Sequence, residues 1–253
     1  MKEKIKYAGA MLICFIAVLF MQMPVLADDG VPETAWRDNA AADFAGGSGT
    51  EADPYQITDG AQLAKVAKDV EDNVTVYKDV YFRLENDIDL SAHRWNPIDV
   101  WKWYENGASE NKTFAGFLDG NGKTIKGLIV DERTDKNSAG LFGNIRDNAG
   151  AATNVGVKDL NIVDARIYAT DEGMERSSSA ILAGYVMANF GHTIRFDNIS
   201  VSGTITNVAG SCSELAVCTA YVDCKNPVIE KFTVEKKSSA LDKILNVLSF
   251  GVY

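Results

Sequence analysis

The sequence predicts an all-β protein whose short strands stack as the successive coils of a solenoid, with a helix at each end. Three observations carry this prediction. Apolar runs rich in Val and Ile alternate between strand faces and are separated by Gly, Asn, Asp and Ser. The alternation slips by one residue within several runs. Two stretches in the second half of the chain also repeat one another.

Residues 1–27 have the pattern of a secretory signal peptide. Three lysines precede an apolar run from Ala8 to about Met21, and Pro24 ends any helix there. Val25-Leu26-Ala27 then fits a cleavage site with small residues. An uncleaved membrane anchor is the alternative, but the run is shorter than the ~20 residues that a spanning helix needs. We therefore expect an extracellular product, secreted or associated with the cell surface, without a stable membrane span.

The net charge of the chain limits the classes of partner that it can bind. The sequence holds 25 basic and 35 acidic side chains. Removing the predicted signal peptide takes away three lysines and Glu3, which leaves 22 basic and 34 acidic side chains and a formal net charge of −12. A charge of this sign argues against nucleic acids and anionic membrane surfaces as partners.

The N-terminal part of the exported chain divides into a leader and a helix. Residues 28–50 are small, polar and glycine-rich, which predicts a flexible leader. Apolar residues then recur at helical spacing, and Asp59 with Gln62 forms a variant of the capping box. We expect a helix over about 59–71 that covers the open N-terminal end of the core.

The predicted β domain spans residues 51–235. Its first clear strand segment is 81–90, where Phe82, Leu84, Ile88 and Leu90 alternate with polar residues. Later runs alternate in the same way but slip, as at Gly127 and between Val157 and Leu160. A strand with one buried face can slip only where it bends, so repeated slips predict a chain that winds around a core.

An internal repeat supports this winding. The segment that begins at Ser138 resembles the segment that begins at Ser179, and Asn154 aligns with Asn198, 44 residues later. ELAVC, from Glu214, begins a third and weaker copy. Each copy holds two apolar strands, so we expect one coil to take about 20 residues, within the range of solenoid repeats.

The C-terminal tail, residues 236–253, is predicted to be amphipathic. Leu241, Ile244, Leu245 and Leu248 fall on one helical face. A helix here could cover the far end of the solenoid, dock a partner or lie on a membrane surface.

Four stretches carry a family resemblance. GSGTEADPYQITDGAQLAKVA, LENDIDLSAHRWNPI, FAGFLDGNGKTIKGLIVD and SAGLFGNI resemble, in order and spacing, the opening of bacterial surface proteins with GLUG-type repeats. These proteins are similar to adhesins of the filamentous-haemagglutinin class. The resemblance covers roughly residues 47–207 and implies a right-handed parallel β-helix, export and a cell-surface or adhesive role. It implies no shared catalytic residues.

The GNGKT sequence at 120–124 is not a phosphate-binding loop. Such a loop needs a glycine five positions before Gly122, where this chain has Phe117, and a helix after the threonine. The glutamate that an EF-hand requires is also missing at its spacing. Asp119, Gly120, Asn121 and Gly122 are therefore predicted to turn the chain, and we expect neither a nucleotide nor another cofactor.

Three cysteines follow the predicted signal peptide: Cys212, Cys218 and Cys224. Five residues separate neighbouring cysteines, which does not match the spacing of zinc ligands. An odd number allows one internal disulfide at most. We expect structural cysteines and no metal site.

The sequence favours a non-catalytic binding or adhesion protein whose ligand is a polysaccharide or a surface protein. Trp95 and Ile98 fit a packed WxPI pattern, whereas Trp101, Trp103 and Tyr104 lie in an inserted loop. Exposed Trp and Tyr rings can stack on sugars or anchor an interface; alternatively, they fold back onto the coil.

A polysaccharide lyase or glycoside hydrolase is the alternative function, since β-helices also carry such enzymes. It would need clustered carboxylates. The acidic candidates are Asp131 and Glu132, in a charged run predicted to be a solvated loop, and Asp87 and Asp89, predicted to face solvent.

Overall fold

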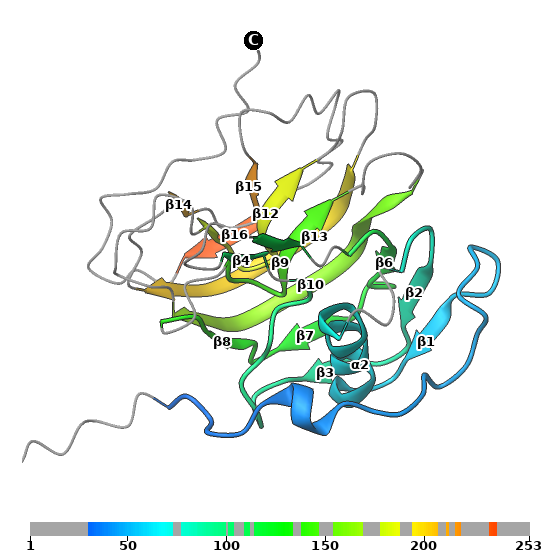
Figure 1. Ribbon diagram of the computed structural model, residues 1–253, viewed down its shortest axis with the longest axis horizontal. Helices are drawn as coiled ribbons and strands as arrows, with labels where there is room; N and C mark the ends of the chain where they lie inside the picture. The colour runs from blue at the N-terminus through cyan, green and yellow to red at the C-terminus, as the bar shows by residue number, and fades with distance from the viewer. Residues whose placement is uncertain are drawn as a thin grey trace, which may run out of the picture. The chain divides into compact units, whose positions relative to one another are not determined.

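Figure 1 shows the computed structural model. Apart from Gly30, every residue that it describes belongs to one compact unit, Val31–Tyr253. The residues it describes are 30–72, 77–99, 101–103, 109–111, 114–133, 138–146, 154–168, 178–187, 194–206, 211–212, 216–218 and 233–236. The predicted signal peptide, Tyr104, Cys224 and all but the first residue of the predicted C-terminal tail lie outside this set.

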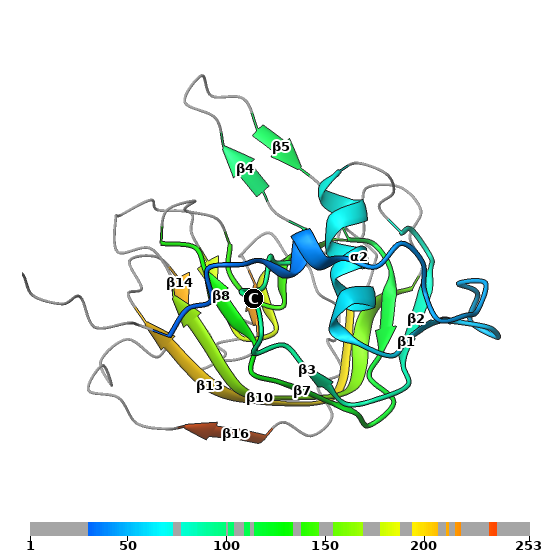
Figure 2. The same cartoon turned by 90° about the horizontal axis from the view of Figure 1, so that it is seen from below.

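Strands dominate the described chain, which confirms the all-β class. The largest sheet has nine strands: β1 (Tyr55–Ile57), β2 (Tyr81–Leu84), β3 (Ile88–Asp89), β6 (Phe117–Asp119), β7 (Thr124–Lys126), β8 (Ile129–Asp131), β10 (Val155–Tyr168), β13 (Ile194–Thr206) and β16 (Thr233–Lys236). All its pairings are parallel. Figure 2 shows β3, β7, β10 and β13 running side by side.

Two smaller parallel sheets accompany the large one. The first joins β9 (Phe142–Arg146), β12 (Ala183–Met187) and β15 (Ala216–Cys218), and the second joins β11 (Ser178–Ser179) and β14 (Ser211–Cys212). From β10 the chain passes through β11 and β12 before it returns to the large sheet as β13, directly beside β10. Strands β10 and β13 of the large sheet are thus separated in sequence by strands of the two smaller sheets.

The pairing register corrects the predicted repeat. Leu118 pairs with Val157, and Val157 with Phe196, so each of these two steps across the sheet takes 39 residues rather than about 20. Asn154 does not match Asn198, because Val155 pairs with Ile194. The Ser138 and Ser179 copies do match, since Phe142 pairs with Ala183, 41 residues later. Each repeat copy is therefore one complete step and not two.

Apolar side chains line up across the strands and form the core. One such ladder consists of Ile88, Ile125, Ile162 and Val201, which pair in sequence and are each at most 2% exposed. An aromatic series adjoins it, with Phe82 6.1 Å from Phe114 and Phe114 5.1 Å from Phe142 between ring centroids. Trp95 and Ile98 are buried, as predicted.

Left-handed residues bend the strands where the sequence slips. Asn121, Asp159 and Asn198 have φ of 53°, 50° and 52°. The amide of Asn198 donates to Asp159 Oδ1 at 2.8 Å, and the backbone N–H of Asn121 donates to Asp119 Oδ1 at 2.8 Å. Val157 and Leu160 are both buried although they are three residues apart. The predicted turn over 119–122 is confirmed.

Helix α2 (Gly60–Glu71) confirms the predicted helix and its cap. Asp59 accepts a hydrogen bond from the backbone N–H of Gln62 at 2.9 Å, and Gln62 Oε1 accepts one from the N–H of Thr58 at 2.7 Å. This reciprocal pair satisfies backbone donors that a helix start otherwise leaves free. The apolar face of α2 belongs to the same core as the strands.

The predicted flexible leader is packed in the structure from Val31 to Thr50. A 3-10 helix, η1 (Trp36–Asn39), places the Trp36 indole N–H 2.9 Å from the Leu90 carbonyl oxygen. The Phe44 ring stacks on Tyr55 with centroids 4.7 Å apart. Two aromatic side chains thus attach a segment whose overall composition is polar and glycine-rich.

The core ladder makes a testable prediction. Ile162→Ala removes a fully buried side chain from the middle of the ladder and should lower the free energy of unfolding by about 2–5 kcal/mol. Val163 is the next residue and lies on the outward side of the strand. Val163→Ala should lower the free energy of unfolding by less than about 1 kcal/mol. Urea unfolding of both variants measures the difference. Equal losses would show that Ile162 does not carry the core.

Two glycines of the 119–122 turn should respond differently to alanine. A Cβ at Gly120 would lie 2.5 Å from the Asp159 carbonyl oxygen and 2.7 Å from Leu160 Cα, so the backbone of two strands would have to separate. A Cβ at Gly122 meets nothing within 4 Å, but its φ of +70° costs an alanine about 1–2 kcal/mol. We expect Gly120→Ala to lower the thermal midpoint clearly more than Gly122→Ala. The reverse order would contradict the described strand contact.

Candidate functional site

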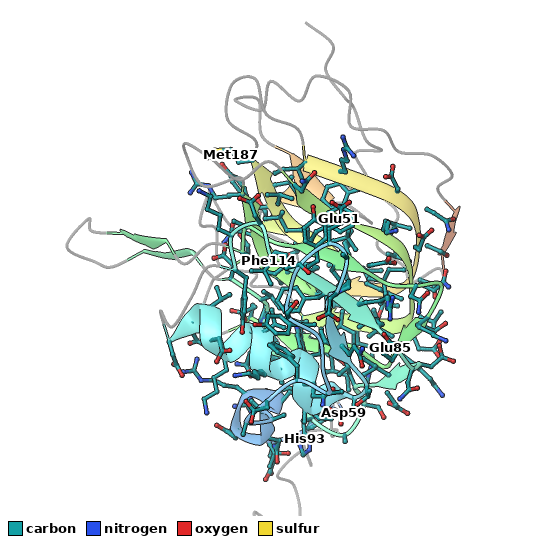
Figure 3. The ribbon with its side chains drawn as sticks, turned by 90° about the vertical axis from the view of Figure 1, so that its right-hand side faces the viewer. Glu51, Asp59, Glu85, His93, Phe114 and Met187 are labelled. Atoms are coloured by element: carbon teal, nitrogen blue, oxygen red, sulfur yellow. The ribbon has the colours of Figure 1, made fainter. Side chains whose placement is uncertain are left out.

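A β-hairpin that interrupts a parallel sheet is the candidate site. Strand β4 (Trp101–Trp103) pairs antiparallel with β5 (Ser109–Asn111), with Trp101 opposite Asn111 and Trp103 opposite Ser109. No other described strands pair antiparallel beyond a single bridge. Figures 2 and 3 show this hairpin extending away from the stacked strands. Two of the three predicted ligand-contacting residues, Trp101 and Trp103, therefore lie in one projecting strand.

The hairpin is inserted into a strand position beside β9. Ile98, before the hairpin, bridges to Phe142, and Phe114, after it, bridges to Ile145. The N–H of Gly143 donates to the Ile98 carbonyl at 2.8 Å, which fixes the first of these two ends. Only two residues of β9 separate the two bridges, so the hairpin replaces about two residues of an otherwise continuous strand.

The base of the hairpin, which we call the neck, consists of Asp99, Phe114, Gly143 and Asn144. It contains a buried carboxyl group. Asp99 is 0% exposed, and its Oδ2 accepts a hydrogen bond from the N–H of Phe114 at 3.1 Å. This bond joins the residue near the start of the insertion to the residue that follows it. Figure 3 labels Phe114, which lies near the point where the hairpin leaves the fold.

The neck leaves several polar atoms unsatisfied. Oδ1 of Asp99 and both side-chain polar atoms of Asn144 have no hydrogen-bond partner among the described residues, although Asn144 is only 1% exposed. Close backbone contact accompanies this pair, because a Cβ at Gly143 would lie 1.9 Å from the Asp99 carbonyl oxygen. The neck is thus tightly packed and yet polar.

Burial dominates the electrostatics of the neck. Desolvation raises the pKa of Asp99 well above its ordinary value, while the hydrogen bond from the Phe114 N–H and the charge of Arg146 act in the opposite direction. In the described part of the chain, no three His, Cys, Asp or Glu residues gather to hold a metal ion. The neck therefore positions the hairpin and favours a neutral Asp99.

The acidic candidates of the sequence do not share a site with the hairpin neck. Asp87 and Asp89 are exposed, as predicted, and Asp87 accepts a hydrogen bond from the Thr124 N–H at 2.8 Å. Asp131 binds Arg133 through both carboxylate oxygens at 2.7 and 2.6 Å. Glu132 is buried. The described start of the charged run, residues 131–133, is thus packed and not a solvated loop, because Arg133 also lies over the Tyr168 ring at 4.9 Å. The rest of the run lies outside the described residues.

Sequence reasoning missed the neck. Asp99 and Asn144 stand next to buried apolar residues in sequence, but nothing in their spacing predicts that they meet. The two cysteines that the structure describes are placed in different sheets, Cys212 in β14 and Cys218 in β15.

Two curated proteins are similar to this chain. One is named halomucin, from Haloquadratum walsbyi, and is 30% identical over 163 residues that cover 63% of this chain and 2% of the relative. The other is named a putative Gly-rich membrane protein, from Evansella cellulosilytica, and is 31% identical over 198 residues that cover 75% of this chain and 18% of the relative. The chain thus spans a small part of either relative. No family model and no solved structure matches it.

The neck makes a prediction about pH. Between the ordinary aspartate pKa of about 3.9 and the higher pKa of Asp99, the folded chain binds more protons than the unfolded chain, so the free energy of unfolding falls as the pH rises. Asp99→Asn removes this loss and should raise the free energy of unfolding at pH 8 by about 1–3 kcal/mol. Denaturant unfolding at pH 5 and pH 8 measures it.

Asp164→Asn is the matched control for this change. Asp164 has the same left-handed backbone, with φ of 55°, but it is exposed. Because Asp164 is exposed, Asp164→Asn should change the free energy of unfolding by less than about 0.5 kcal/mol. A less stable Asp99→Asn variant at both pH values would mean that the folded neck needs the ionised carboxylate.

Proposed function

We propose that this chain is a non-catalytic binding or adhesion module, secreted or held at the cell surface, built on a right-handed parallel β-helix related to GLUG-repeat surface proteins. Its ligand is a glycan or a surface protein, contacted by the β4–β5 hairpin. The observation that carries the proposal is this hairpin, which is an antiparallel insertion with two tryptophans in a parallel fold.

The strand order supports a β-helix. Strands β10, β13 and β16 of the large sheet pair in parallel in that order, and the chain passes through the smaller sheets between each of them and the next. Parallel crossovers of this kind are right-handed in nearly all proteins. In a β-helix, α2 would cover the N-terminal end of the core, to which it contributes Leu63, Val66 and Val70.

The similar proteins support a location at the surface. One is named after mucins and the other is named a membrane protein, and this chain matches a small part of each. Across the residues that the structure describes, no helix is both long and apolar enough to cross a membrane. A predicted signal peptide and a negative net charge agree with an exported module.

The hairpin suits ligand binding because of its residue types and its mounting. Positions 101 and 103 lie two apart in one strand, so they belong to the same face of the ribbon. Tryptophan rings supply large rigid surfaces for sugars or protein anchors at low entropic cost. The neck at Asp99 and Phe114 is buried and closed, so the insertion can vary without disturbing the core.

Binding to a panel of neutral and acidic polysaccharides tests this function. For the polymer that binds, Trp101→Ala and Trp103→Ala should each weaken the affinity about 10-fold or more, as expected of central aromatic contacts. Lys102→Ala, which changes the other face of the same strand, should alter it less than about 3-fold. Calorimetry and tryptophan fluorescence provide the readout.

A deletion variant separates binding from folding. Joining Asp99 to Phe114 through one glycine keeps Ile98 and Phe114 at the spacing of Phe142 and Ile145 in β9. This variant should fold with a similar thermal midpoint and bind no ligand. Full binding by it would assign the ligand to another surface. Release of new chain ends from any polymer would instead establish the alternative, a polysaccharide lyase or glycoside hydrolase.

A further inference from the structure

The outward face of four neighbouring strands, β2, β6, β10 and β13, carries a row of alternating charges. Arg83 pairs with Asp119, Asp119 with Lys158, and Lys158 with Asp197. The side chains of Arg83, Asp119 and Lys158 are 38%, 24% and 39% exposed. Lys158 Nζ lies 3.0 Å from Asp119 Oδ2. From β2 to β13 the row therefore reads positive, negative, positive, negative.

A second row lies two residues earlier on the same strands and thus on the same face. Its members are Tyr81, Phe117, Gly156 and Arg195, which pair in that order. The Tyr81 and Phe117 rings are 5.7 Å apart between centroids and partly exposed. Gly156 presents no side chain and is itself buried, and Arg195 is exposed. This row therefore offers two aromatic rings, one position without a side chain and one cation.

Each row becomes its own complement when its order is reversed. A two-fold axis parallel to the strands, between β6 and β10, reverses the order of strands but keeps each row opposite itself. In the charged row, Arg83 then faces Asp197 of the second copy, and Asp119 faces Lys158 of the second copy. All four positions meet opposite charges.

The aromatic row fits the same operation. Phe117 then lies opposite Gly156 of the second copy, which has no side chain, and Tyr81 faces Arg195 of the second copy. A guanidinium over an aromatic ring is a favourable contact. We propose that this face of β2, β6, β10 and β13 binds a second copy of the chain in a symmetric dimer.

The surroundings of Tyr81 favour this partner. Burial comes first among the causes that raise the pKa of Tyr81, followed by the nearby carboxylates of Glu51 and Asp79, while Arg195 of the same chain acts in the opposite direction. Two carboxylates therefore act on Tyr81 against one cation of the same chain, which favours a second cation there. Figure 3 labels Glu51 beside the strands.

The alternation of sign also distinguishes a second copy from a charged polymer. A polyanion would be repelled by Asp119 and Asp197, whereas a reversed copy of the same row meets no like charge. Strands are spaced about 4.8 Å apart, so four strands make a narrow face. Such an interface is smaller than the roughly 800 Å² per partner of stable complexes, so the dimer should be weak and concentration-dependent.

Sedimentation velocity of the processed, exported chain tests the dimer from micromolar to millimolar concentration at physiological ionic strength. We expect reversible dimerisation of the unaltered protein. Lys158→Asp places like charges at two symmetric contacts and should weaken dimerisation about 10-fold or more. Asp119→Lys should do the same. The double variant D119K/K158D restores every opposite pair and should dimerise within about 3-fold of the unaltered chain.

Several outcomes overturn the proposal. The unaltered chain can stay monomeric over the whole range, Lys158→Asp can dimerise normally, or the double variant can fail to recover. Circular dichroism checks that each variant is folded, and the pair Arg83→Glu with Asp197→Arg repeats the swap if position 158 is not tolerated. A monomer that loses polysaccharide binding on Lys158→Asp would assign this face to a glycan instead.

Discussion

The parallel, in-register contact between strands about 39 residues apart is the constraint on which the fold depends. Strands such as β6 and β7 have three residues and cannot bury a face alone. Ile125 of β7, for example, is buried because it lies between Ile88 and Ile162 in the ladder. The helix and the N-terminal segment pack onto this core rather than build one of their own.

Local chemistry was predictable wherever a few neighbouring residues decide the outcome. The cap at Asp59, the turn at Asp119–Gly122 and the burial of Trp95 all follow from short patterns, and the structure has them. The length of one step did not follow from such patterns. The 44-residue match of Asn154 with Asn198 fails because Asp159, a left-handed corner residue, is the true counterpart of Asn198.

Contacts between distant segments explain the remaining differences. Residues 31–50 have the composition of a flexible segment, but Trp36 reaches Leu90 and Phe44 reaches Tyr55 and Phe82. Asp99 and Asn144 are 45 residues apart in sequence and meet only through the bridges of Ile98 and Phe114 to β9. Composition and periodicity describe a segment by itself, so they cannot show which distant partner removes it from water.

Net charge and local charge act at different ranges in the proposed dimer. Each copy carries a formal net charge of −10, and the charge is more negative once the predicted signal peptide is removed. Two copies therefore repel at long range, which opposes association at low ionic strength. At physiological ionic strength this repulsion is screened beyond about 8 Å, whereas the opposed pairs of Arg83, Asp119, Lys158 and Asp197 would lie within that distance. The same chain can therefore stay dispersed when dilute and pair when it is concentrated, since a high effective concentration compensates for a small interface.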